Sequence, residues 1–171
     1  MQLDKFADYA LRLLMTLAVR APEKVPVQQI AALYGVSEHH LSKVGTTLVR
    51  EEFIASERGR TGGLVLARAA DRIRGGDVVR ALKRDDPIVE CFGPDKSCLI
   101  LPACGLRQSL AEAQCAFYAA LDGYTLADIT RSRSALAADG SIIYHDRRVG
   151  ADGELGPFQM TRATFDRVAK S

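Results

Sequence analysis

Three cysteines, Cys91, Cys98 and Cys104, lie within a span of fourteen residues. This span also contains two prolines and a glycine, and a helical pattern begins directly after it, so we expect a loop. Thiolates are soft ligands, and several of them on one flexible loop suit an iron–sulfur cluster or a zinc ion. The sequence therefore predicts a metal-binding segment and leaves both kinds of metal open at this level.

The composition of the chain restricts the context in which these cysteines act. With 171 residues, 47% hydrophobic and 26% charged, the chain suits one globular domain with or without an appendage. The N-terminal residues lack the pattern of a signal peptide, and there is no uninterrupted apolar run of about 18 residues, so we expect neither secretion nor a membrane span. In the cytoplasmic location that we therefore expect, clustered thiols bind metal or react more often than they form structural disulfides.

The first 50 residues carry the apolar periodicity of three helices. Residues 4–19 place apolar side chains on one face of an amphipathic helix: Ala10, Leu13, Leu14, Leu17 and Ala18. Residues 27–34 form a short second helix that Gly35 can end, and Ser37 is suited to be the N-cap of a third helix, which runs to about Glu51. Two short helices around a tight turn indicate a helix-turn-helix.

A β-hairpin is predicted directly after the third helix. Residues 53–56 and 64–67 have strand composition, and the tip between them is basic and rich in glycine. A hairpin in this place is the wing of a winged helix, where Arg58 and Arg60 can pair with phosphates or enter a minor groove. We therefore predict a mainly α fold with a small β-hairpin wing, namely a winged helix-turn-helix followed by a long dimerisation helix.

The third helix and the wing supply the candidate DNA-binding residues. From residue 37 to residue 84 there are ten Lys or Arg against six Asp or Glu, although the net charge of the chain is only +2. Hydroxyl and basic side chains suit phosphates and base edges. The candidates are Ser37, His39, His40, Ser42, Lys43, Thr46 and Thr47 on the helix, and Arg58, Arg60 and Thr61 at the wing tip. Because His39 and His40 are adjacent, and so about 100° apart on a helix, we favour a surface or DNA-facing role over metal binding.

A long amphipathic helix is predicted after the cysteines. Its apolar residues are Leu106, Leu110, Ala113, Phe117, Ala120 and Leu121. A three-helix winged domain offers little surface to cover this stripe, so we expect two copies of the helix to pair in a homodimer, which matches a pseudo-palindromic double-stranded DNA operator. The alternative is that the helix packs back on its own domain. Cys115 lies on this helix beside Ala116 and Phe117, and we expect it to be a buried structural thiol.

The domain organisation follows from these elements. We assign residues 1–83 to a winged-helix DNA-binding domain, 84–104 to a cysteine loop, 105–130 to the dimerisation helix and its end segment, and 131–171 to a loosely ordered extension. The sequence carries no nucleophile–base pair, no phosphate loop before a helix and no paired-carboxylate motif, so we expect no enzymatic activity.

Five segments carry a resemblance to a known family: residues 3–12, 34–37, 58–63, 73–80 and 121–128. Over about residues 1–130 the chain resembles the iron–sulfur-cluster-binding winged-helix transcriptional regulators of the NsrR, RirA and IscR type. The Leu-Pro-Ala-Cys motif at residues 101–104, with residues 106–110, is most similar to the nitric-oxide-sensitive NsrR branch. The resemblance implies a homodimeric repressor that senses nitric oxide or nitrosative stress.

The same resemblance implies a set of cluster ligands. Cys91, Cys98 and Cys104 would supply three thiolates, while the fourth ligand differs between branches. The IscR type uses a histidine three residues after the third cysteine, where this chain has Arg107, so a [4Fe–4S] cluster is favoured over [2Fe–2S]. The NsrR type can use an aspartate of the other subunit, and Asp8 stands at the matching position; the alternative for Asp8 is an exposed helix carboxylate.

The spacing of the cysteines leaves alternatives for the sensed signal. Six residues separate Cys91 from Cys98, a gap between those of the NsrR and RirA branches. A regulator that senses iron or cluster status, in the manner of RirA and IscR, is therefore one alternative. A cluster-free regulator that uses the same thiols for redox sensing is the other.

Overall fold

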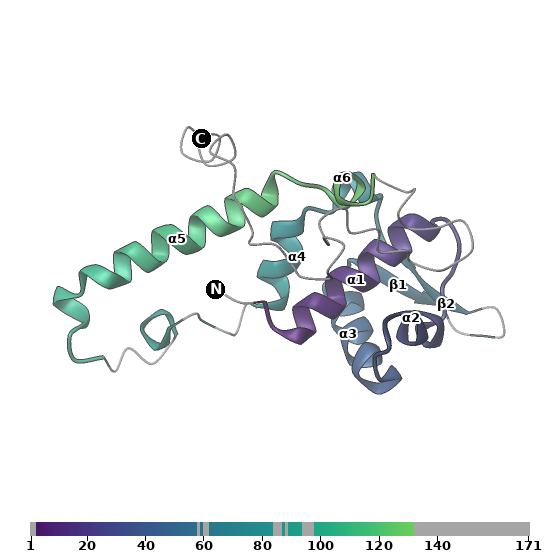
Figure 1. The fold of residues 1–171 in the computed structure, drawn as a ribbon, viewed down its shortest axis with the longest axis horizontal. Helices are drawn as coiled ribbons and strands as arrows, with labels where there is room; N and C mark the ends of the chain where they lie inside the picture. Colours follow the sequence, from purple (N-terminus) through teal and green to yellow (C-terminus); the bar gives the residue numbers. More distant parts are fainter. Residues whose placement is uncertain are drawn as a thin grey trace, which may run out of the picture. The chain divides into compact units, whose positions relative to one another are not determined.

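The structure is a computed structural model that describes residues 3–57, 59, 62–83, 87, 89–93 and 98–131 (Figure 1). Its contacts divide the chain into two units, Met1–Arg131 and Ser132–Ser171. The second unit, on which the prediction of a loosely ordered extension falls, lies outside the described residues. The first unit is mainly helical with one two-stranded antiparallel sheet, which confirms the predicted fold class.

Helix α1 (Lys5–Arg20) lies at the centre of the hydrophobic core. Asp4 is its N-cap, because the carboxylate accepts a hydrogen bond of 2.8 Å from the backbone N–H of Ala7. The predicted apolar face is buried along the whole helix, as Ala10, Leu13, Leu14, Leu17 and Ala18 show. Each leucine removed from water contributes about 1.5–3 kcal/mol, so this face sets the position of everything packed on it.

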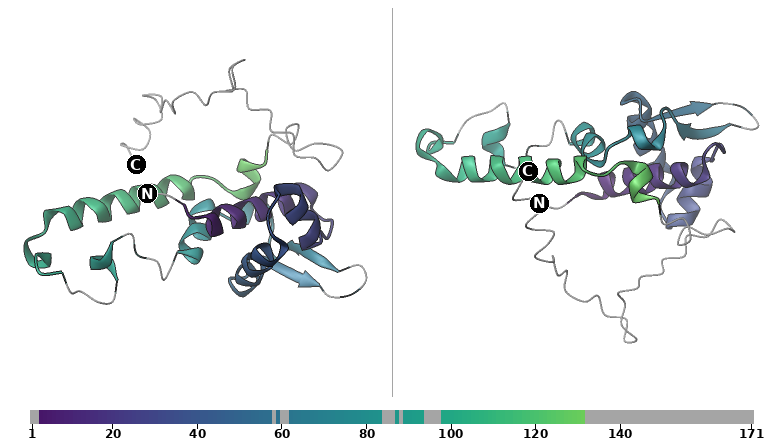
Figure 2. Two further views of the ribbon diagram at one scale, coloured as in Figure 1. Left: turned by 60° about the horizontal axis from the view of Figure 1, so that its bottom comes forward. Right: turned by 90° about the horizontal axis from the view of Figure 1, so that it is seen from above.

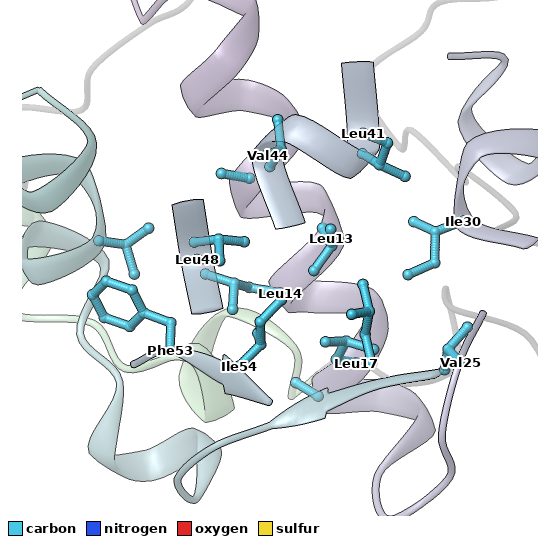
Figure 3. Packing of buried hydrophobic residues seen from close by; sticks show 14 of the residues in the cluster. Leu13, Leu14, Leu17, Val25, Ile30, Leu41, Val44, Leu48, Phe53 and Ile54 are labelled. Atoms are coloured by element: carbon cyan, nitrogen blue, oxygen red, sulfur yellow. The ribbon is translucent and has the colours of Figure 1, made fainter. Parts of the chain in front are cut away.

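Helices α2 (Val27–Tyr34) and α3 (Glu38–Arg50) form the predicted helix-turn-helix. Gly35 between them has φ +61°, a left-handed conformation that favours glycine, and its N–H caps the end of α2. Ser37 occupies the N-cap position of α3, but within the described part of the chain its side chain makes no capping hydrogen bond. Figure 3 shows Leu41, Val44 and Leu48 of α3 against the leucines of α1.

The wing consists of β1 (Ile54–Glu57) and β2 (Gly63–Leu66), paired in register from Ile54–Leu66 to Glu57–Gly63. Strand β1 begins one residue later than predicted, because the N–H of Phe53 bonds to the carbonyl of Leu48 and closes the end of α3. The wing is attached to the loop before α2 by two hydrogen bonds between Val25 and Leu64, of 2.9 and 3.0 Å.

The C-terminal half of the first unit contains α4 (Gly75–Leu82), α5 (Gly105–Asp122) and α6 (Leu126–Ile129), with 3-10 turns at Ala70–Arg72, Glu90–Phe92 and Leu101–Ala103. Helix α4 contacts α1 and α5, and α6 contacts α1. Both views of Figure 2 show the N-terminal half of α5 extending away from α1, α2 and α3. Among the described residues, no helix is long and apolar enough to cross a bilayer.

Candidate DNA-binding face and cysteine segment

The outer face of α3 carries the predicted DNA-contacting side chains. Since Leu41, Val44 and Leu48 occupy the buried face, helical geometry turns the polar residues outward. Six of them are exposed, and Thr47 is half-buried. The exposed six are Ser37, His39, His40, Ser42, Lys43 and Thr46. The predicted third helix is thus present, with its polar side chains on the surface, while contact with DNA stays a prediction.

A shallow groove separates this face from the wing. Ser42 and Thr46 of α3 lie on one side of it and Ser56 of β1 lies on the other, while Val49 and Leu64 also contribute to its lining. Within the helix, the hydroxyl of Thr46 donates to the carbonyl of Ser42 at 2.9 Å. The predicted wing-tip contacts Arg58, Arg60 and Thr61 lie outside the described residues. Strand β1, which leads to the tip, contacts α3.

Asp8, the predicted fourth ligand, is linked to the helix-turn-helix through a short chain of contacts. Its carboxylate pairs with Nε of Arg12 at 2.9 Å, one turn further along α1. The guanidinium of Arg12 lies over the ring of Tyr34, 5.5 Å from its centroid. The Tyr34 hydroxyl is 2.9 Å from Oγ1 of Thr16 and donates to the Arg12 carbonyl at 3.3 Å. Tyr34 is the last residue of α2, so these contacts join α1 to the end of α2.

The cysteine segment joins α4 to α5. Cys91 lies in the turn Glu90–Phe92, and Cys104 is the residue before α5. Both are half-buried, Cys98 is exposed, and all three are free thiols. The guanidinium of Arg107 lies over the ring of Phe92, 5.4 Å from its centroid, and so links the turn containing Cys91 to the first turn of α5.

The donor set fits an iron–sulfur cluster in its chemistry, since three uncombined thiols on one segment are what such a cluster needs from a protein. In a single chain, however, these donors are not brought together. In the described part of the sequence, no group of three or more His, Cys, Asp or Glu side chains lies close enough together to hold a metal ion. Asp8 is paired with Arg12. The cysteine side chains would have to converge as a cluster is bound.

Apolar side chains around the cysteine segment and along α5 are left at the surface. Leu99 is 97% exposed, while Ile100 and Leu106 are each 65% exposed. No residue of α5, all of which is described, is buried. Packing of α5 on its own domain, the alternative considered from sequence, involves α4 and leaves the apolar stripe partly exposed: Leu110, Phe117 and Leu121 are half-buried, and Leu106, Ala113 and Ala120 are exposed. The prediction that Cys115 is buried is wrong for the single chain, where this residue is exposed.

Two charged contacts that sequence reasoning missed link α4 to the start of α1 and to the end of α5. Lys83 Nζ lies 2.7 Å from Asp4, and a hydrogen bond from Lys83, with one from the Ala7 backbone, lowers the pKa of Asp4. Arg80 binds Asp122 with both terminal nitrogens, and this hydrogen bonding lowers the pKa of Asp122. Arg80 and Asp122 fall in two of the segments that carry the family resemblance, but a sequence gives no direct sign that these segments meet.

The chain is similar in sequence to known transcriptional regulators. A sequence model of the Rrf2 family, described as an iron-dependent transcriptional regulator, matches residues 3–132. The transcriptional regulator NsrR of Geobacillus kaustophilus is 43% identical over 80% of this chain and 94% of its own length. NsrR of Bacillus subtilis is 41% identical over 78% of this chain and 92% of its own length.

Solved structures agree on the fold. IscR of T. potens superposes with a TM-score of 0.63 and 25% identity, covering 82% of this chain and 94% of its own. CymR, the global cysteine regulator of B. subtilis, gives a TM-score of 0.61 at 24% identity over 77% of this chain and 97% of its own. The relatives are transcriptional regulators, which confirms that the chain is a DNA-binding regulator and not an enzyme. By the extent of these matches, the chain belongs to the Rrf2 family of transcriptional regulators.

Proposed function

We propose that the chain is a homodimeric transcriptional repressor whose iron–sulfur cluster senses nitric oxide or nitrosative stress in the cytoplasm. One observation carries this proposal. Three free thiols gather on one segment beside α5, in a chain that is 43% identical to an NsrR regulator across 94% of that protein. In this proposal residues 1–83 bind DNA, 84–104 hold the cluster, 105–130 form the dimer, and 131–171 are an extension.

The proposed ligands are Cys91, Cys98 and Cys104 of one chain and Asp8 of the other. Such a cluster, [4Fe–4S] rather than [2Fe–2S], would supply iron that reacts with nitric oxide. An aspartate oxygen is a weaker ligand than a thiolate, so the Asp8 position would be the one most easily opened. Binding of Asp8 to iron would compete with its ion pair to Arg12, which is 2.9 Å long in the structure.

The contacts of Arg12 suggest how the protein would respond. When Asp8 releases or regains Arg12, the guanidinium over Tyr34 shifts, and Tyr34 ends the helix that precedes the turn to α3. The exposed polar face of α3 and the wing tip would contact an operator of two half-sites. Phosphate contacts contribute most of the total affinity for DNA and do not depend on its sequence. Loss of the cluster should therefore weaken sequence-specific binding more than non-specific, salt-sensitive binding.

The decisive experiment is anaerobic purification followed by visible absorption and native mass spectrometry, before and after addition of nitric oxide. We expect a dimer with about one cluster per chain, loss of its absorption with nitric oxide, and weaker binding to the promoter DNA. Material that is free of iron after anaerobic reconstitution, or a cluster that does not respond to nitric oxide, would overturn the proposal.

Cys98→Ala and Cys115→Ala form a matched pair for this experiment, because both thiols are exposed in the single chain and Cys115 is not a proposed ligand. Cys98→Ala should abolish retention of the cluster while leaving a folded protein. Cys115→Ala should keep the iron content of the wild type. Equal iron content in the two variants would remove Cys98 from the ligand set.

A second function, sensing of iron or cluster status, is favoured by the description of the matched family as iron-dependent. The same thiols would then report iron supply. Iron chelation would release the promoter DNA, whereas nitric oxide would leave binding unchanged. A third, cluster-free thiol regulator would respond to oxidant and reductant without holding iron, since its free cysteines would themselves be the sensing groups.

A further inference from the structure

Helices α4 and α5 pack against each other at a place that we call the α4–α5 joint, where Gly76 and Arg80 of α4 contact Tyr118 and Asp122 of α5. Nη1 of Arg80 donates to Oδ1 of Asp122 at 2.8 Å, and Nη2 donates to the other carboxylate oxygen. The same guanidinium lies over the ring of Tyr118, 4.8 Å from its centroid. Because the planar guanidinium is held both by a carboxylate and by a ring, its orientation is fixed, which a contact through a single atom would not achieve.

Gly76 allows the two helices to approach this closely. A Cβ atom at this position would clash with Oδ1 of Asp122 and would lie 3.0 Å from the backbone carbonyl oxygen of Tyr118. Gly75, the preceding residue, would meet the carbonyl oxygen of Leu121 at 3.3 Å. The first turn of α4 therefore rests on the last turns of α5 with no room for a side chain.

Backbone hydrogen bonds continue the joint beyond the end of α5. The N–H of Gly75 donates to the carbonyl of Tyr124 at 3.0 Å, and the N–H of Leu126 donates to the carbonyl of Ile73 at 2.7 Å. Leu126, at the start of α6, is 3% exposed and belongs to the core around α1. The segment directly after α5 is thereby tied to the residues that lead into α4, next to the Arg80–Asp122 pair.

The remainder of α5 has no buried residue, so the joint determines the direction in which the helix leaves the winged helix. We infer that Arg80 and Asp122, with Gly76, are positioning residues that set the separation of the two recognition helices, and hence the spacing of the half-sites that the regulator reads. This inference rests on the proposed dimer through α5.

The length of α5 makes the joint a sensitive point. A helix of 18 residues is about 27 Å long, so a rotation of about 10° at one end moves the other end by about 5 Å. That movement exceeds the rise of one base pair, about 3.4 Å. An exposed ion pair of this kind contributes little to folding stability, so loss of the pair should change geometry more than folding.

The test is selection of bound sequences from a randomised DNA duplex library by the full-length protein. Two variants disturb the joint in different ways: Arg80→Gln removes the clamp, and Gly76→Ala inserts a side chain between the helices. Each has a matched control. Arg20→Gln removes the same charge from an exposed pair in which Arg20 binds Glu23 with two nitrogens, at 2.8 Å each. Gly123→Ala adds a Cβ whose nearest neighbour is 3.4 Å away.

We expect the wild type and both controls to select paired half-sites at one spacing. The two joint variants should select the same half-site sequence at a shifted spacing or at several spacings. Their affinity for the wild-type site should fall about tenfold, while binding to random DNA stays unchanged. If either variant loses its helical circular dichroism, Asp122→Asn, which keeps the size of the side chain, replaces it.

The same selection separates failure of the inference from failure of the proposed function. Joint variants that keep the wild-type spacing and affinity would overturn the role of the joint and leave the dimeric regulator standing. A wild type that selects single, unpaired half-sites would overturn the dimer itself, and the inference with it.

Discussion

Asp4 connects the start of α1 to the end of α4, and its replacement separates two contributions to stability. The carboxylate caps α1 through the Ala7 N–H at 2.8 Å and pairs with Lys83 at 2.7 Å. Asp4→Asn keeps a capping oxygen and loses the charge, whereas Asp4→Ala loses both. A lost N-cap costs about 1 kcal/mol. The ion pair, in which the Asp4 side chain is 50% exposed and Lys83 16%, contributes about 0.5 kcal/mol.

We therefore expect Asp4→Asn to lower the free energy of unfolding by about 0.5 kcal/mol and Asp4→Ala by about 1.5 kcal/mol. Urea denaturation followed by circular dichroism measures both, and an unchanged m-value would show that the unfolded state is not altered. Equal losses in the two variants would refute the reasoning, because the cap would then contribute nothing beyond the charge.

The pH dependence gives an independent check on the same residue. Folding lowers the pKa of Asp4 from its ordinary value of 3.8, chiefly through the hydrogen bond from Lys83. The stabilisation is therefore fully present well above pH 3.8 and is lost as the pH falls through the lower pKa of the folded state. The difference in stability between wild type and Asp4→Asn should shrink over that acidic range and stay constant near neutral pH.

Three further predictions concern the core, the wing and the proposed ligand. Leu48→Ala in the fully buried face of α3 should cost about 2–5 kcal/mol by urea denaturation, whereas Val49→Ala, at an exposed neighbouring position, should cost far less. Gly63→Ala places a Cβ 3.0 Å from the backbone of Val25 and should break the two Val25–Leu64 hydrogen bonds. We expect the free energy of unfolding to fall by about 2 kcal/mol and DNA binding in an anisotropy titration to weaken. Unchanged stability and unchanged DNA affinity would mean that the wing can shift freely. Asp8→Asn should change stability by under about 0.5 kcal/mol but alter cluster retention or the rate of reaction with nitric oxide, and an unaffected spectrum and rate would exclude Asp8 as a ligand.

The elements that position the DNA-binding face could be predicted from sequence because each has a local cause. The apolar period of α1 and α3, the left-handed glycine at residue 35 and the glycine-rich wing tip act over a few residues. The start of β1 lies one residue later than predicted because of a contact with another element: the N–H of Phe53 is hydrogen-bonded to the end of α3. Periodicity alone cannot reveal such a bond, so boundaries were less accurate than the elements themselves.

The α4–α5 joint could not be predicted, because Arg80 and Asp122 are 42 residues apart and each looks like an ordinary surface residue on an amphipathic helix. Cys115 shows the opposite error. Apolar neighbours in sequence suggested burial, yet burial depends on what covers the helix, and in the described part of the chain Cys115 is exposed. Whether Arg80 and Asp122 meet, and whether Cys115 is buried, depends on tertiary and quaternary contacts that local sequence does not reveal.

Three features of the single chain have one common explanation if the regulator works as a pair. In the described residues, the donors of the cysteine segment are not assembled, the apolar stripe of α5 is partly exposed, and Asp8 is paired with Arg12. A second copy lying along α5 would cover the stripe and bring a carboxylate from another chain towards the thiols. Cluster binding and dimer geometry would then depend on each other, so the affinity for iron and the affinity for paired half-sites should change together in every variant of α5 or the cysteine segment.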